Sequence, residues 1–218
     1  MSTDTTTGVR RGLRSESSSV RLRAALAVGT RPDPLHIDLL VERCAVEPDF
    51  SVRENLTWAL TRHPATRTVP ALIAALRDER AQARSQALHT LSKIGDRQAW
   101  PAITRELLTD ADDEVARSAW RAAVALVPEG SQPALAEVLA TQLGRGERAT
   151  QLSLSRALIA LGEESRPVLQ AAMAHPDPRV RQHGTATERL WRDPDAGFAF
   201  AVEQAKRIVA LGPDRQEE

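Results

Sequence analysis

Apolar residues recur along much of this chain at the spacing of one helix face, and residues 68–95 show the pattern most fully. The second half of that stretch places on one side of a helix Ala83, Ala87, Thr90, Leu91 and Ile94. Its first half carries a similar apolar stripe. The pattern therefore predicts a short helix opened by Pro70, a break near Asp78, and a longer helix that ends at Gly95.

The same two-helix layout returns along the chain with a nearly constant period. One position of the second helix is held in turn by Arg21, Arg53, Arg84, Arg117, Gln151 and Arg181. Three positions after each lies a predicted core position, held by Ala24, Leu56, Ala87, Trp120, Leu154 and Gly184. A fixed period of this length built from two helices is typical of an α-solenoid.

We therefore predict an all-α fold, an α-solenoid of about six helical hairpins. The repeats are expected at about residues 9–31, 34–64, 68–95, 98–130, 132–162 and 165–192. Residues 1–8 are polar and threonine-rich and are expected to form a disordered tail. Residues 193–212 are predicted to form a C-terminal helix that caps the last repeat, and residues 213–218 a tail.

The segments VRENLTWAL and ARSQALHTL resemble HEAT repeats, and the resemblance extends over residues 9–192. It implies a right-handed superhelix whose concave surface is lined by the second helices. A narrower resemblance, carried by DFSVRENLTWALTRHP, QARSQALHTLSKIGDRQAWPAI, DADDEVARSAWRAAVALVPEG and RDPDAGF, is to a group of actinobacterial HEAT-repeat proteins. Some of these are effector-like domains behind a MerR-type DNA-binding head, which implies a regulatory or sensing role.

The charge balance argues against a global attraction to nucleic acid or anionic lipid, because 29 basic and 29 acidic residues leave a net charge of zero. The N-terminal segment, residues 1–31, is more basic, and we interpret it as a solvated cap rather than a nucleic-acid surface. The single cysteine, Cys44, excludes a disulfide within the chain. The sequence has no long apolar run and no signal-peptide layout, so a cytoplasmic location is expected.

We predict no catalytic set, metal site or cofactor. The acidic cluster at residues 109–115 lacks the ligand spacing of a calcium loop and is interpreted as helix capping. Carboxylates one helical turn before the repeat position, at Asp49, Asp113, Glu147 and Asp177, are expected to cap the second helices and to meet the arginines. His89 and Glu54 are considered as an acid–base pair and are judged weak evidence for catalysis.

The candidate binding residues are those of the second helices that point away from the predicted core. They are Glu54, Trp58, Ser85, His89, Ser118, Arg121 and Arg156. Trp58 has two interpretations, a binding hot spot or a side chain that fills a gap between repeats.

The favoured function is a non-enzymatic scaffold, regulatory in role, that binds a protein partner on the concave face. One alternative is a ligand-sensing effector module, for which a small ligand would be the partner. Another is a DNA-binding protein or an alkyl-base DNA glycosylase, using Trp58 and Glu54. A chromophore lyase is less favoured still. Nucleic acid is a less favoured partner than protein, and no membrane association is expected.

Overall fold

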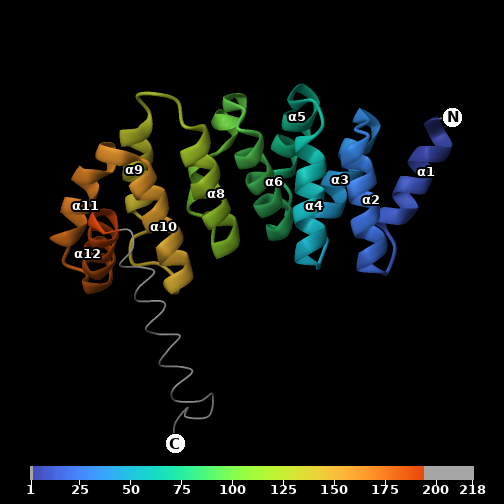
Figure 1. Ribbon diagram of the computed structural model, residues 1–218. Helices are drawn as coiled ribbons and strands as arrows, with labels where there is room; N and C mark the ends of the chain where they lie inside the picture. The colour runs from blue at the N-terminus through green and yellow to red at the C-terminus, as the bar shows by residue number, and fades with distance from the viewer. Residues whose placement is uncertain (1, 194–218) are drawn as a thin grey trace, which may run out of the picture. The chain divides into compact units, whose positions relative to one another are not determined.

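The computed structural model describes residues 2–193, and these residues are helical with no β-strand among them (Figure 1). The all-α solenoid prediction is therefore confirmed. The chain divides into two compact units, residues 1–138 and 139–218. The predicted capping helix at 193–212 and the tail at 213–218 lie outside the described residues, apart from Asp193.

The first unit is built from helical hairpins. Its elements are α1 (Ser2–Leu13), α2 (Ser18–Thr30), η1 (Pro34–His36), α3 (Ile37–Cys44), α4 (Phe50–Thr61), α5 (Ala65–Ala75), α6 (Ala81–Ile94), η2 (Arg97–Ala102), α7 (Arg105–Leu108) and α8 (Asp113–Leu126). The second helices of the hairpins, α2, α4, α6 and α8, pack side by side in one layer (Figure 1). The first helices α3 and α5 pack together as a second layer.

The second unit continues the hairpin pattern. Its elements are α10 (Arg148–Ala160), η3 (Gly162–Ser165), α11 (Arg166–Met173) and α12 (Pro178–Arg192), and the unit boundary falls within α9 (Gln132–Ala140). Within this unit α11 packs on α12, and α10 also contacts α12.

Two features differ from the prediction. Helix α1 begins at Ser2, within the segment predicted as a tail. The helix docks closely on α2, because a Cβ added at Gly12 would lie 2.9 Å from the Cβ of Ala24. Pro70 does not open its helix, since α5 starts at Ala65. Proline has no N–H to donate to the helix, and the burial of Val69 and Leu72 offsets the loss of that hydrogen bond.

The predicted helix ends and core positions largely agree with the structure. Gly95 ends α6 in the left-handed conformation with φ of 72°, which favours glycine. Leu56, Ala87 and Leu154 are buried. Trp120 is completely buried, and its indole Nε1–H donates to the carbonyl of Leu108 at 2.8 Å. Its large ring occupies space beside the short helix α7.

Four of the repeat arginines hold the loop that precedes their second helix, whereas Arg117 pairs with Glu114. Arg21, Arg53, Arg84 and Arg181 each donate from Nη1 to two successive carbonyl oxygens of that loop, at 2.7–3.0 Å. Gln151 serves the same role with its amide, which donates to the carbonyl of Gly146 at 3.0 Å. These carbonyls are left over where the chain turns, so the side chains satisfy polar groups that the helices cannot.

The predicted carboxylate partners of these arginines need correction. Asp49 and Asp177 do cap α4 and α12. Helix α8 is capped instead by Asp112, immediately before the predicted Asp113, and Glu147 makes no side-chain cap bond. The arginines that form inter-repeat ion pairs do so with carboxylates in the loop of the following hairpin.

Two such pairs join neighbouring hairpins in the first unit. Arg21 forms a bidentate pair with Glu47, with both contacts at 2.7 Å, and Arg84 pairs with Asp110 at 3.0 Å. Glu47 is fully buried and also accepts from Arg43 and from the amide of Asp49. Burial alone would raise the pKa of Glu47, but these hydrogen bonds outweigh it and lower the pKa to about 2.

We predict that Glu47→Gln lowers the free energy of unfolding by roughly 3–5 kcal/mol, because it leaves the buried Arg21 and the half-buried Arg43 without their carboxylate. Glu42→Gln is the matched control, since its pair with Arg14 is largely exposed and should contribute only about 0–1 kcal/mol. Urea unfolding followed by circular dichroism at pH 7 measures both.

The pH dependence gives a second test of the same variant. The pKa of Glu47 in the folded protein lies below the ordinary value of 4.5. The charged carboxylate therefore stabilises the protein fully above pH 4.5, and this contribution is lost as the pH falls towards 2. The difference between wild type and Glu47→Gln should therefore shrink on acidification. A difference that is small at pH 7, or that grows towards pH 3, would contradict the assignment.

Candidate functional site

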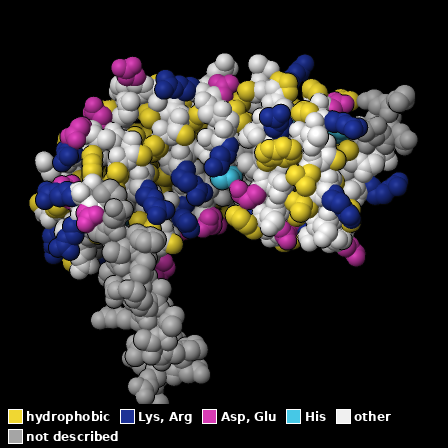
Figure 2. All heavy atoms as spheres, in the orientation of Figure 1, with side chains coloured by type: hydrophobic (Ala, Val, Ile, Leu, Met, Phe, Trp, Pro, Cys, Tyr) yellow, Lys and Arg dark blue, Asp and Glu magenta, His cyan; other side chains and the backbone are white. Residues whose placement is uncertain are grey.

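One side chain from each second helix of the first unit contributes to a row across these helices; Leu26, Trp58 and Arg121 are exposed, and His89 is half-buried. Its members are Leu26 on α2, Trp58 on α4 and His89 on α6, each five positions after its repeat arginine, and Arg121 on α8, four positions after Arg117. We call these four residues the second-helix row. Figure 2 shows this face, with exposed hydrophobic side chains over the region of α4 and a histidine beside acidic and basic side chains nearer α8.

Trp58 is both anchored and accessible. A Cβ built at Gly29 of α2 would lie 2.2 Å from Cζ3 of the indole, so the ring rests directly on the α2 backbone. The side chain nevertheless stays 39% exposed. The two interpretations of Trp58 from the sequence are therefore compatible, because the ring fills the gap between two repeats and presents the remainder of its surface to solvent.

His89 lies beside Glu54, with 3.4 Å between Nε2 and the carboxylate Oε1. Desolvation lowers the pKa of His89; the charge of Glu54 opposes this, and those of Arg121 and Lys93 add to it. The imidazole is therefore mainly neutral at neutral pH. The structure brings the suspected acid–base pair together, but its contact lacks hydrogen-bond geometry.

Ser85 and Ser118 are not surface residues, contrary to the sequence-based expectation. Their exposed fractions are 7% and 1%, and their hydroxyls lie 3.0 Å apart between α6 and α8. Thr57 and Thr90 make an equivalent contact between α4 and α6 at 3.4 Å. Small side chains allow neighbouring helices to approach closely, and their hydroxyls hydrogen-bond to one another there. Buried in this way, the two serines are not available to contact a partner protein.

Arg121 is exposed, and its Nη2 donates to the hydroxyl of Ser118 at 3.0 Å. Among the described residues, no carboxylate lies within ion-pair distance of its guanidinium. Partial desolvation, followed by the charge of Arg117, lowers the pKa of Arg121. The residue remains a cation at neutral pH. Arg156, the remaining predicted residue, is exposed on α10 of the second unit.

A buried histidine in the second unit was missed by sequence reasoning. His183 accepts the amide hydrogen of Gly144 at Nδ1, at 3.0 Å, so its neutral ring must carry the proton on Nε2. Nε2 lies 3.0 Å from the carbonyl of Gln151 and 3.1 Å from the hydroxyl of Ser155. In this tautomer the ring cannot take a proton from Ser155, so the pair is not set up as a nucleophile and its base.

His183 also fixes a close approach of chain segments. Gly144 has φ of 83°, and a Cβ there would lie 3.1 Å from the backbone nitrogen of Val180. The histidine therefore fastens the loop before α10 to the start of α12. Burial lowers the pKa of His183, and its hydrogen bond to the Gln151 carbonyl partly opposes that.

We predict that His183→Asn removes an acid-induced loss of stability. The asparagine Oδ1 can accept from the Gly144 amide and does not titrate. In wild type the pKa of His183 in the folded state lies below its unfolded value of about 6.5. The stabilising contribution of the neutral ring is therefore fully present above about pH 6.5 and falls as the pH decreases below it. Urea unfolding between pH 8 and pH 5 measures both proteins, and identical pH profiles would contradict this role for His183.

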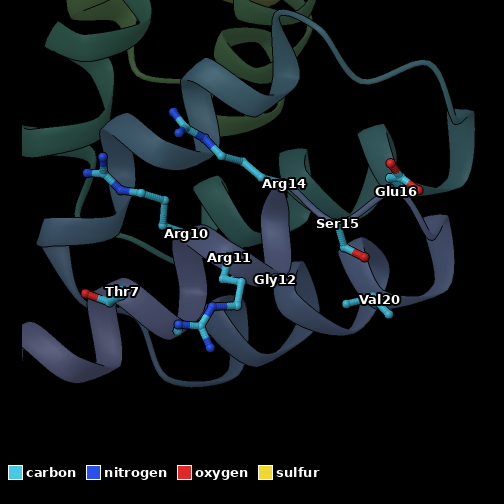
Figure 3. A pocket seen from close by; sticks show the side chains of 9 residues that line it. Thr7, Arg10, Arg11, Gly12, Arg14, Ser15, Glu16 and Val20 are labelled. Atoms are coloured by element: carbon cyan, nitrogen blue, oxygen red, sulfur yellow. The ribbon is translucent and has the colours of Figure 1, made fainter.

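The arginines of α1 do not converge on one point. An open hollow beside this helix is lined by Arg10, Arg11 and Arg14. In Figure 3 the side chain of Arg11 points away from those of Arg10 and Arg14. Arg14 is also paired with Glu42. This arrangement suits a solvated terminal repeat better than a site that concentrates positive charge on a phosphate.

Three further observations limit the chemistry of the described residues. No group of three His, Cys, Asp or Glu side chains within them is placed to hold a metal ion. The buried thiol of Cys44 has its pKa raised to about 12, by desolvation first and then by Glu47, so it is an unreactive thiol. No helix in residues 2–193 has the length and apolar character needed to cross a membrane.

Comparison with known proteins supports the repeat assignment. Residues 45–125 match the family model of HEAT repeats. The sequence matches none of the curated proteins with which it was compared.

One solved structure shows the same fold at low identity. A crystal structure of the karyopherin Kap121p, bound to the extreme C-terminus of the protein phosphatase Cdc14p, matches with a TM-score of 0.59 and 18% identity. The match covers 85% of this chain and 23% of the karyopherin. An engineered protein (TM-score 0.47, 17% identity, 85% of this chain and 98% of that one) and a designed armadillo repeat protein (0.41, 16%, 83% and 97%) are also similar.

Proposed function

We propose that this protein is an interaction scaffold and that the second-helix row of the first unit binds a protein partner. The observation that carries the proposal is Trp58, whose indole is held on Gly29 and is 39% exposed. An aromatic ring that is already ordered loses little conformational entropy on binding, and tryptophan is enriched among residues that dominate interfaces.

The surroundings of Trp58 support the same role. Leu26 lies one turn before Gly29 on α2 and is 39% exposed, so it extends the apolar surface beside the indole. Arg121 adds an exposed cation at the other end of the row. A surface with an apolar centre and polar surroundings is typical of protein interfaces. The similar karyopherin, solved with a protein C-terminus bound, is an example of a repeat protein that holds a peptide.

We predict that Trp58→Ala weakens partner binding by about tenfold or more, as expected for loss of a hot-spot residue. Affinity capture from an extract of the native cells, quantified by mass spectrometry, compares wild type with this variant. Leu35→Ala is the matched control, because Leu35 is 62% exposed and lies on η1, outside the row.

Circular dichroism must show that both variants remain folded. A protein retained by wild type and by Leu35→Ala, and lost by Trp58→Ala, supports the proposal. A protein partner that all three forms retain equally would place binding elsewhere on the chain, and retention of nucleic acid alone would contradict a protein scaffold.

A further inference from the structure

The apolar end of the second-helix row spans two neighbouring helices. Leu26 and Trp58 are each 39% exposed, and their helices α2 and α4 pack directly together. The indole already rests on the α2 backbone at Gly29, so the ring cannot move closer to that helix. This end therefore offers a fixed surface to one apolar side chain of a partner.

The opposite end of the row attracts negative charge. Arg121 contacts Ser118, and Arg117 raises the local positive potential around it. The nearest opposing charges belong to Glu114, which is paired with Arg117, and to Glu54. A partner carboxylate would give the guanidinium an ionic partner, and arginine binds carboxylates through two parallel hydrogen bonds.

The middle of the row has different chemistry. His89 is mainly neutral at neutral pH, and the carboxylate of Glu54 beside it is 45% exposed. A negative group placed here would meet Glu54, whose charge acts on His89 more strongly than that of Arg121 or of Lys93. The middle therefore disfavours an acidic residue and accepts a neutral one.

The spacing of the helices sets the length of the partner segment. Trp58 and Arg121 lie on α4 and α8, with α6 between them. Two interhelical steps of 8–10 Å give roughly 16–20 Å between these positions, which an extended chain covers in about five or six residues at 3.3 Å per residue. The narrow row, one side chain per helix, suits an extended segment that crosses the helices.

Resting on the proposed function, we infer that the second-helix row recognises an extended segment of a partner protein that carries an apolar residue and a carboxylate about five or six positions apart. The apolar residue packs on Leu26 and Trp58, and the carboxylate pairs with Arg121. The residues between them are not acidic.

A phage-displayed library of random dodecapeptides, selected on the full-length protein and counter-selected on Trp58→Ala, tests this inference. We expect the enriched peptides to share an apolar residue and an Asp or Glu at the stated separation. Fluorescence polarisation of the labelled peptides should show a loss of about tenfold with Arg121→Glu. Replacing the peptide carboxylate by Lys should restore binding to that variant. Arg77→Glu is the matched control, because Arg77 is exposed and lies after α5.

The outcomes separate the inference from the proposed function. Trp58-dependent peptides that lack the acidic residue, or that respond alike to Arg121→Glu and Arg77→Glu, would overturn the inference and leave the scaffold proposal standing. A selection that yields no Trp58-dependent peptide would contradict both. Sedimentation of the protein alone adds one outcome, since a dimer that Trp58→Ala abolishes would assign the row to a second copy of the chain and overturn the inference.

Discussion

A side-chain donor near the start of the second helix, an arginine in four of the repeats, is the interaction on which the repeat geometry depends. Where the chain turns from the first helix to the second, main-chain carbonyls lack helical partners. In four repeats an arginine donates to two of these carbonyls at once. A planar, permanently charged donor suits this task better than lysine, because one terminal nitrogen can serve two acceptors while the remaining N–H groups stay available.

The remaining N–H groups link one repeat to the next. Arg21 reaches Glu47 and Arg84 reaches Asp110, so the same side chain that orders its own loop also holds the neighbouring one. Hydroxyl pairs between α4, α6 and α8 then allow the second helices to pack closely. The proposed binding surface follows from this stacking, because the packed second helices carry Trp58, His89 and Arg121 in order.

The periodic sequence pattern predicted the features that recur in every repeat and missed contacts that occur only once. Every repeat carries an apolar stripe, so the hairpins and buried positions such as Leu56 and Trp120 could be predicted from spacing alone.

Ser85 and Ser118 were assigned to the surface by their helix phase and polarity. A helix wheel does not show how closely a neighbouring helix approaches, and this approach buries both hydroxyls. His183 was missed because two of its partners are main-chain groups, which leave no trace in a side-chain pattern. One signal for the ion pairs was present in the sequence, since Glu47 and Asp110 occupy the same place in their repeats; Asp78, at that place in the repeat between them, pairs instead with Arg80. The exposed row carried no such signal, because its members differ in chemistry from one repeat to the next.

Site-specific photocrosslinking tests most directly whether Trp58 lies at the binding surface. A photoreactive phenylalanine analogue is placed at position 58 in one protein and at position 35 in another, and both are irradiated in the native cells. We expect a covalent adduct with a distinct protein from position 58 and none from position 35. Equal adducts from both positions, or an adduct from position 35 alone, would contradict the assignment of the second-helix row as the binding surface.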